Sequence, residues 1–343
     1  MIRTAVLGFG VSGRIFHAPF LAADDAYSLD FVVTGNAGRA AQAAAEYPQA
    51  TVLSGADELF ARAAEVDLVV LATPPVTHAD LAAAALDHGL HVVVDKPFAV
   101  TSAQSEALIE HAHRVGRVLT VFQNRRWDGD FRTLHRLVDD GELGRVHTFE
   151  SRFEWWKPQG PRDWKAATGV ADGGGILFDL GTHLIDQACR LFGPVEQVHA
   201  DVLRRGAGEG DDDTFLVLAH ENGTRSRLFM SSLAAVPGPR FHVLGEKAGY
   251  TKWGLDPQEQ ALKDGARPGD DGFGHEPREN WGTLGVRGDT RAVEPEPGDY
   301  GRFYRLLAAA IENGGELPVD PRDAVDVLRI IERAHARKGE LSR

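Results

Sequence analysis

Cysteine and positive charge are both scarce in this chain of 343 residues. Cys189 is the single cysteine, and one cysteine cannot form an internal disulfide. No charged leader with an apolar core precedes the first apolar segment, so we expect a reducing, cytoplasmic location. The 37 Lys and Arg face 50 Asp and Glu, which leaves a formal charge of −13. This charge repels nucleic acids and anionic membranes, so we expect neither as a partner.

Long apolar runs and internal repeats are also missing. The apolar runs fall well short of the roughly 20 residues that a membrane-spanning helix needs. No repeat or low-complexity segment interrupts the chain. The length therefore predicts about two domains of roughly 150 residues each, each with its own core.

Residues 1–122 alternate apolar strands with alanine-rich amphipathic helices. This alternation predicts an α/β Rossmann domain, in which a doubly wound parallel sheet carries helices on both faces. The predicted strands are Thr4–Leu7, Leu29–Thr34, Asp67–Ala72, His91–Val94 and Val118–Phe122. The predicted helices are Arg39–Glu46, His78–His88 and Ser102–Val115.

Residues 123–343 follow another pattern, in which runs of strands come after helices. The pattern predicts an α+β substrate-binding domain with an open, mostly antiparallel sheet and helices on one face. Expected elements are helices at Phe131–Asp139, after Gly175, at Tyr300–Asn313 and at Arg322–Lys338, and strands near Val146–Phe153, Val195–Leu203, Thr214–His220 and Thr224–Ser231. The Gly- and Pro-rich segment Asp264–Gly288 predicts a long loop. An open sheet can pair subunits, so we expect a homodimer or homotetramer.

The sequence Gly8-x-Gly10-x-x-Gly13 lies between an apolar strand and a helix. In a dinucleotide-binding turn the first glycine permits the tight turn, the second lets the backbone approach the pyrophosphate, and the third lets the helix pack on the strand. The helix N-terminus adds N–H groups and a positive dipole end. A plain glycine turn is the alternative, but the flanking strand and helix favour nucleotide binding.

No acidic residue follows the second strand, where the chain reads Thr34-Gly35-Asn36-Ala37-Gly38-Arg39. A carboxylate at this point would bind the adenosine ribose hydroxyls and repel a 2′-phosphate. Thr34 and Asn36 can instead hydrogen-bond that phosphate, and Arg39 can pair with it. We therefore expect NADP to be preferred, with NAD possible; the alternative is that Arg39 is simply solvated.

Asp95-Lys96-Pro97 ends another apolar strand. A lysine at the carboxyl edge of a parallel strand faces the region where such sheets bind ligands, and its ammonium can stabilise a substrate oxyanion as hydride leaves carbon. A surface lysine in a turn is the alternative. Thr73-Pro74-Pro75, after the preceding strand, is expected near the nicotinamide ribose. The predicted cofactor contacts are Gly8, Phe9, Gly10, Ser12, Gly13, Thr34, Asn36, Arg39, Thr73, Pro74, His78, Asp95 and Lys96.

A third motif runs from Asp172-Gly-Gly-Gly to Asp179 and His183. A spacing of four places Asp179 and His183 on one helix face. Histidine exchanges protons near neutral pH, and the aspartate can orient its ring or share a substrate hydroxyl. A structural pair is the alternative, and a third metal ligand is not evident, so we predict no metal site.

These motifs resemble those of the Gfo/Idh/MocA family of oxidoreductases, over essentially the whole chain. The likeness is carried by residues 8–13, by Val93-Val94-Asp95-Lys96-Pro97-Phe98, and by Gly174-Gly175 through Asp179 to His183. The family usually has Glu-Lys-Pro where this chain has Asp95, which shortens a supporting carboxylate. The resemblance implies that Lys96, Asp179 and His183 form a catalytic triad, with His183 as acid/base, and that the peptide before Pro97 is cis.

Within the family, residues 95–101, 122–128 and 254–259 are similar to the branch that contains scyllo-inositol dehydrogenases, which implies a polyol or sugar substrate. The tryptophans between residues 152 and 165 can stack on a sugar ring, although packing in the second core is an equal alternative. The predicted substrate contacts are Asn124, Arg126, Trp156, Trp164 and His183.

Together these observations predict an NAD(P)-dependent dehydrogenase that acts on a secondary alcohol of a cyclic polyol or sugar. In this hypothesis His183 removes the hydroxyl proton, Lys96 steadies the oxyanion, and hydride passes to C4 of the nicotinamide. A reductase of an imine or another carbonyl would use the same residues. A non-catalytic NAD(P)-sensing regulator would share the scaffold but would be expected to lack the lysine or the histidine.

Overall fold

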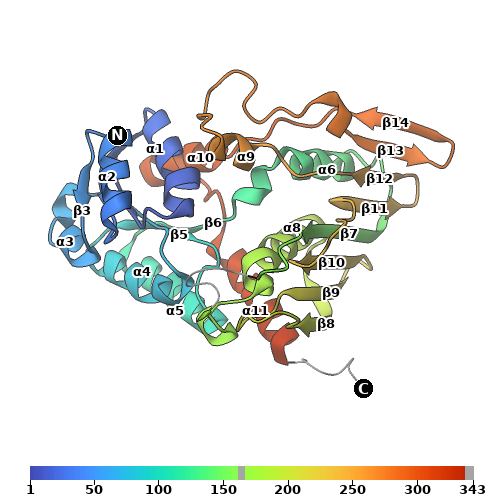
Figure 1. The fold of residues 1–343 in the computed structure, drawn as a ribbon, viewed down its shortest axis with the longest axis horizontal. Helices are drawn as coiled ribbons and strands as arrows, with labels where there is room; N and C mark the ends of the chain where they lie inside the picture. The colour runs from blue at the N-terminus through green and yellow to red at the C-terminus, as the bar shows by residue number, and fades with distance from the viewer. Residues whose placement is uncertain (161–166, 337–343) are drawn as a thin grey trace. The chain divides into compact units, whose positions relative to one another are not determined.

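The computed structural model describes residues 1–160 and 167–336 (Figure 1). The chain forms two compact units. Unit 1 contains residues 1–124, 258–273 and 300–325, and unit 2 contains residues 125–257, 274–299 and the chain from 326 onward. Each unit is built around its own sheet.

The sheet of unit 1 has six parallel strands in the order β3-β2-β1-β4-β5-β6. This order is that of a Rossmann fold, so the predicted doubly wound sheet is confirmed. The strands are β1 (Ile2–Leu7), β2 (Tyr27–Val33), β3 (Thr51–Leu53), β4 (Leu68–Leu71), β5 (His91–Asp95) and β6 (Leu119–Phe122). The sequence pattern missed β3, because three residues at a sheet edge carry little apolar periodicity.

Helices cover this sheet in the blue-to-cyan part of Figure 1. They are α1 (Ala18–Ala23), α2 (Ala37–Glu46), α3 (Ala56–Phe60), α4 (His78–Asp87) and α5 (Ser102–Val115). Helix α5 has the predicted bounds because both of its ends are specified locally. Thr101 and Gln104 form a reciprocal capping box at its start, and Gly116 ends it at a φ of 65°.

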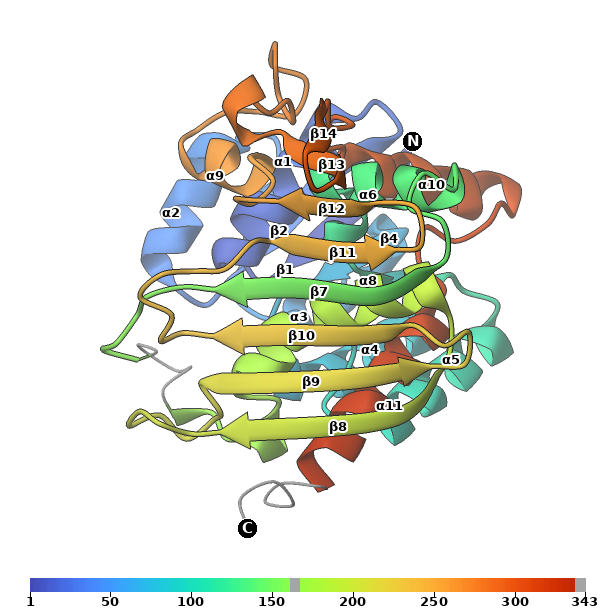
Figure 2. The ribbon, with the colours of Figure 1, turned by 90° about the vertical axis from the view of Figure 1, so that its right-hand side faces the viewer.

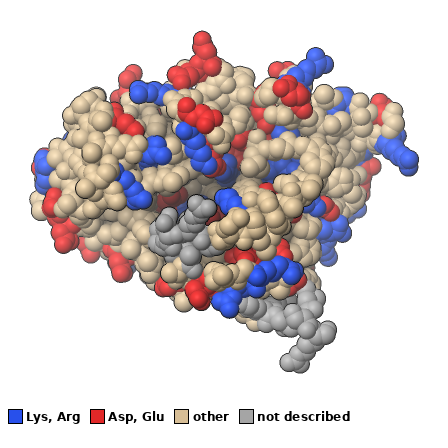
Figure 3. Space-filling model, in the orientation of Figure 1, with Lys and Arg blue, Asp and Glu red and all other residues tan. Residues whose placement is uncertain are grey.

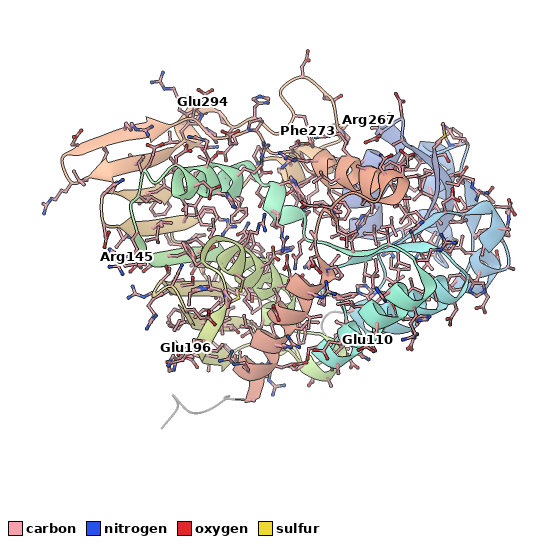
Figure 4. The ribbon with its side chains drawn as sticks, turned by 180° about the vertical axis from the view of Figure 1, so that it is seen from behind. Glu110, Arg145, Glu196, Arg267, Phe273 and Glu294 are labelled. Atoms are coloured by element: carbon pink, nitrogen blue, oxygen red, sulfur yellow. The ribbon has the colours of Figure 1, made fainter. Side chains whose placement is uncertain are left out.

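Two later segments return to unit 1, so the expected single boundary after residue 122 does not describe the two units. They carry α9 (Gln258–Lys263) and α10 (Gly301–Asn313). Aromatic packing accounts for the return: Phe303 of α10 contacts Phe122 with ring centroids 4.9 Å apart. Phe273, labelled in Figure 4, contacts Phe20 of α1 with centroids 6.4 Å apart.

Unit 2 has an eight-stranded sheet in the order β14-β13-β12-β11-β7-β10-β9-β8. Only the β7–β10 pair is parallel among its described strands, which confirms the mostly antiparallel sheet. The strands are β7 (Val146–Glu154), β8 (Val195–Leu203), β9 (Asp213–His220), β10 (Arg225–Ser231), β11 (Phe241–Gly245), β12 (Gly249–Lys252), β13 (Gly282–Val286) and β14 (Asp289–Val293).

Helices α6 (Gly129–Asp139) and α8 (Thr182–Phe192) lie behind this sheet in Figure 2, and its other face is turned to the viewer. Strand β7 alternates accordingly: Phe149 and Phe153 are buried, whereas Glu150 and Arg152 are part-exposed. The final helix is α11 (Pro321–Ala336). On the face shown in Figure 3, acidic and basic side chains are interspersed and no broad basic field appears. Among the described residues, no helix is long and apolar enough to cross a membrane.

The predicted long loop over Asp264–Gly288 is wrong at its end, because Gly282–Val286 forms β13 and pairs with β12 and β14. Strand β13 carries two glycines and lies beside a short hairpin partner. Its pairing is therefore set by neighbouring strands rather than by local propensity. Strands β11 and β12 were not predicted either.

Candidate functional site

The glycine turn of unit 1 has the tight geometry that its sequence predicts. Gly8 adopts a φ of +106°, and a Cβ there would lie 2.4 Å from the carbonyl oxygen of Ala72. A Cβ on Gly13 would lie 1.9 Å from the carbonyl oxygen of Gly8. Neither position therefore admits a side chain. The chain then enters a π-helical turn, Gly13–His17, before α1 begins.

Space remains above the middle of this turn. The one heavy atom of the described residues within 4 Å of a Cβ built on Gly10 is Nη1 of Arg39, at 3.8 Å. An open backbone beside a guanidinium fits a dinucleotide pyrophosphate or phosphate. Arg39 is placed there by helix α2, whose start is capped by Asn36: its side-chain oxygen accepts the Arg39 main-chain N–H at 3.0 Å. The hydroxyl of Thr34 accepts the main-chain N–H of Asn36 at 3.4 Å.

The end of β5 lies against the same turn. The hydroxyl of Ser12 donates to Oδ2 of Asp95, and Oδ1 of Asp95 accepts the main-chain N–H of Lys96 at 2.8 Å. The Lys96–Pro97 peptide is cis, as the family resemblance implied. Burial alone would raise the pKa of Asp95, but His17, Ser12 and the Lys96 ammonium outweigh it and hold that pKa below its usual value. Asp95 is therefore ionised at neutral pH.

Thr73, Pro74 and His78 follow β4, next to β5 in the sheet. His78 is fully buried, with Nδ1 2.8 Å from the carbonyl oxygen of Pro97 and Nε2 2.9 Å from that of Thr73. His78 therefore ties the segment after β4 to the segment after β5, and its contact with the cofactor stays a prediction. Burial lowers the pKa of His78 more than the two carbonyls and Asp95 raise it, which favours the neutral imidazole.

Asp179 and His183 lie on one continuous helical segment of unit 2. Leu177–Gly181 forms a π-helical turn, and α8 continues from Thr182. Asp211 caps the start of this segment, because its Oδ2 accepts the main-chain N–H of Leu177 at 2.9 Å. A Cβ on Gly175, which has a φ of +100°, would lie 2.0 Å from Oδ1 of Asp211. The glycines before the helix therefore let this carboxylate approach the helix start.

The ring of His183 is 5% exposed and meets Phe153 of β7 edge-on, with centroids 6.2 Å apart. Phe153 is backed by the buried guanidinium of Arg240, 4.2 Å from its centroid. Arg240 donates to Gln187 at 2.7 Å and to Ser151 at 2.5 Å, and lies 3.4 Å from Oδ2 of Asp130. Since Gln187 follows His183 by one helical turn, this network fixes the face of α8 that carries the histidine.

The predicted substrate residues occupy different surroundings. Arg126 makes a two-bonded ion pair with Asp186 of α8, at 2.8 and 2.6 Å, so part of its guanidinium is committed within unit 2. Asn124 is the last residue of the first segment of unit 1 and is buried, with 5% exposure. Trp156 is 57% exposed, which suits a ring-stacking role better than a core one. Trp164 lies outside the described residues.

The structure thus gathers the predicted residues in two groups. Unit 1 holds the glycine turn, Arg39 and the Asp95–Lys96 strand end, and unit 2 holds Asp179 and His183. Sequence reasoning missed the residues that support both groups: His17, Asp186 and Asp211. Their contacts depend on strands and helices distant in sequence, so no local pattern marks them. Within the described residues, no three His, Cys, Asp or Glu side chains are grouped as metal ligands.

Comparison with known proteins agrees with this division. Residues 2–123 match a family model for oxidoreductases with an NAD-binding Rossmann fold, and residues 131–251 match a model for the GFO/IDH/MocA C-terminal domain. The chain is 38% identical to the oxidoreductase YdgJ of Escherichia coli, over 96% of this chain and 94% of that protein. It is 33% identical to scyllo-inositol 2-dehydrogenase (NADP(+)) IolW of Bacillus subtilis, over 97% of this chain and 92% of that protein.

A solved structure has the same architecture. The oxidoreductase yvaA of Bacillus subtilis superposes with a TM-score of 0.92 at 32% identity, over 99% of this chain and 98% of that one. A similarity that spans both units shows that the fold of each is shared.

Proposed function

The chain belongs to the Gfo/Idh/MocA family of oxidoreductases, and from this membership we propose that it transfers a hydride between NADP and a secondary alcohol or ketone of a cyclic polyol or sugar. One observation carries the proposal: the Ser12–Asp95 contact joins the glycine turn to the strand end at Lys96. We therefore expect a cofactor on the turn to lie near the Lys96 ammonium. Such a lysine suits charge stabilisation during hydride transfer.

In the proposed mechanism the dinucleotide supplies hydride acceptance and donation at its nicotinamide. Gly8, Gly10 and Gly13, with the main chain of Phe9, would hold the pyrophosphate at the open turn. Lys96 donates to the substrate oxygen and stabilises the charge that develops there. His183 takes the hydroxyl proton during oxidation and returns it during reduction, and Asp179 orients the substrate hydroxyl or the imidazole. The proposal requires Lys96 and His183 to act on the same alcohol.

The preference for NADP follows from the end of β2. No acidic side chain stands between Thr34 and Arg39 to repel a 2′-phosphate. Arg39 faces the glycine turn, and Thr34 and Asn36 add polar groups beside it. The name of IolW includes NADP(+), which supports the same choice. Steady-state kinetics with both cofactors test it; a preference for NAD above about tenfold would reverse it.

The inositol-like substrate class is the finer part of the proposal. Similarity to IolW supports it, together with the exposed ring of Trp156 and the polar groups of Asn124 and Arg126. The test is a screen in which cyclic polyols, aldoses, keto acids and imines are each followed through NADPH absorbance. Turnover restricted to keto acids or imines would refute the polyol assignment while leaving hydride transfer in place.

We also propose that the protein is a homo-oligomer that pairs through the outer face of the unit 2 sheet. The rings of Phe215 and Phe229 contact there at 4.8 Å between centroids, and Arg152 lies 4.1 Å from the centroid of Phe229. Both phenylalanines are only part-buried, although they lie in mid-sheet strands. A mixed apolar and charged face of this kind suits a second copy of the chain.

A further inference from the structure

A histidine that no motif marks lies within the first unit's polar core. His17 ends the π-helical turn that follows the glycine turn, and its side chain is 0% exposed. Its ring packs on Phe122 at the end of β6, with centroids 4.3 Å apart. π-Helical turns often mark functional positions, and this one rotates His17 into the interior beside β5 and β6. His17 has no role in the mechanism above.

One ring nitrogen of His17 is fixed by Tyr304 of α10. Nδ1 lies 2.6 Å from the Tyr304 hydroxyl. Burial, with Tyr27 and Asp95 nearby, raises the pKa of Tyr304 well above its usual value, so this phenol keeps its proton. Tyr27 in turn donates to the main-chain oxygen of Tyr304 at 2.6 Å. When the Tyr304 hydroxyl donates to Nδ1, the imidazole hydrogen resides on Nε2.

The other nitrogen faces the carboxylate that precedes Lys96. Nε2 of His17 lies 3.9 Å from Oδ2 of Asp95, longer than a hydrogen bond, and this buried atom has no hydrogen-bond partner among the described residues. The ring therefore acts on the carboxylate electrostatically, and it helps to lower the pKa of Asp95. The same oxygen accepts from Ser12, and the second oxygen accepts the Lys96 main-chain N–H at 2.8 Å. Hydrogen bonds therefore join Tyr304 to His17 and Asp95 to the backbone of Lys96, and the 3.9 Å approach of His17 to Asp95 lies between them. The three side chains come from α10, the π-helical turn and β5.

We propose that His17, oriented by Tyr304, is a positioning residue that holds Asp95 in place and thereby fixes the main chain at Lys96. The inference rests on the proposed role of Lys96 in hydride transfer. The competing interpretation is that His17 only fills space between β6 and α10. The two differ in one respect: a space-filling ring needs no donor on Nε2, whereas a positioning residue does.

Three substitutions separate these roles in the full-length protein. His17→Phe keeps a ring against Phe122 but removes the donor, and His17→Gln retains an N–H group near the position of Nε2. Tyr304→Phe removes only the hydroxyl that selects the tautomer. The matched control is His91→Gln. His91 lies at the other end of β5 from Asp95 and accepts the Val118 main-chain N–H at 2.9 Å.

Kinetics with NADP and the best substrate of the screen give the first readout. We expect His17→Phe to lower kcat by about tenfold or more, since small displacements of a catalytic group cost up to roughly a hundredfold. We expect His17→Gln to keep a kcat close to that of the wild type, and Tyr304→Phe to have a kcat between those of the two His17 variants. The kcat of His91→Gln should stay within about twofold of the wild type. Equal activity of the Phe and Gln variants at matched melting temperature would overturn the proposal. If His17→Phe does not fold, an unchanged kcat in Tyr304→Phe overturns it instead.

A second readout needs no substrate. The chain has seven lysines, so reductive methylation with ¹³C-formaldehyde gives a simple NMR spectrum, in which Lys96→Arg identifies the Lys96 signal. The groups that face Asp95 are His17, Ser12, Lys96, His78 and Tyr304. Loss of the His17 donor should raise the pKa of Asp95. The NMR signal of Lys96 changes position when Asp95 ionises at acid pH, and this change should move to higher pH in His17→Phe. The move should be smaller in His17→Gln.

An unmoved titration step in both His17 variants would refute the positioning role. A shifted step in a protein that oxidises no polyol would instead refute the proposed function and leave the positioning role standing. The two failures are therefore distinguishable.

Discussion

Glu276 should make the stability of unit 2 depend on pH in an unusual direction. Its carboxylate lies 3.0 Å from the ammonium of Lys252, and the two side chains are 2% and 0% exposed. Lys252 also donates to the main-chain oxygen of Trp253 at 2.6 Å. Burial raises the pKa of Glu276 from 4.5 to about 7, with repulsion from Asp130 and Asp256, although Lys252 opposes the shift.

The sign follows from proton binding. Between pH 4.5 and about 7 the folded protein binds more protons at Glu276 than the unfolded chain does. The free energy of unfolding therefore falls as pH rises through this window and is level above it. A difference of about 2.5 pKa units at roughly 1.4 kcal/mol each amounts to about 3 kcal/mol, as an order of magnitude. For a protein of this size that corresponds to several degrees in melting temperature.

The assay compares thermal melts of the wild type and Glu276→Gln, followed by circular dichroism from about pH 5 to about pH 8. The glutamine resembles the protonated acid, so we expect the variant to gain stability relative to wild type as pH rises. Glu279→Gln is the control, because Glu279 is exposed three residues away and should follow the wild type. Parallel curves for wild type and Glu276→Gln would refute the reasoning.

Four further predictions concern activity and assembly. Lys96→Ala should lower kcat by at least about a hundredfold while cofactor affinity, measured by NADPH fluorescence, stays within about threefold; unchanged turnover would remove the lysine from the mechanism. His183→Asn should abolish the acid limb of the kcat/KM profile, and a retained limb would assign that proton to another group. Arg39→Ala should raise KM for NADP by roughly tenfold or more and leave KM for NAD nearly unchanged, as separate titrations would show. Phe229→Asp should reduce the oligomer to a smaller species in light scattering, and an unaltered mass would place the interface elsewhere.

Much of unit 1 is predictable because its elements are specified locally. Apolar runs with β-branched residues mark β4 and β5, and α5 carries its own caps. Glycine spacing, together with the flanking strand and helix, predicts the dinucleotide turn, and Gly8 and Gly13 lie where a Cβ would collide with main-chain atoms. Local steric requirements of this kind are readable from one sequence.

The rest depends on partners that are distant along the chain. Strand β13 forms through pairing with β12 and β14. Helix α10 joins unit 1 partly through Tyr304, whose partners His17 and Tyr27 lie 287 and 277 positions earlier. Neither signal exists within a short window. The number and type of elements in the first half of the chain are therefore more predictable than the strands β12, β13 and β14 at the edge of the unit 2 sheet.

The same reasoning explains why the candidate site is only half visible in the sequence. Groups proposed to touch substrate or cofactor carry chemistry of their own, so Lys96, Asp179 and His183 stand out by residue type and spacing. Their supports are ordinary residues whose effect lies in what they hold: Asp211 binds the N–H of Leu177, Gln187 binds the carbonyl of Arg125, and Asp95 binds the N–H of Lys96. Each of these bonds ends on main chain, which has no sequence signature. A buried polar side chain that is bonded to the backbone beside a reactive residue is therefore the feature to search for. Asp95 is such a side chain, and His17 is found as its neighbour.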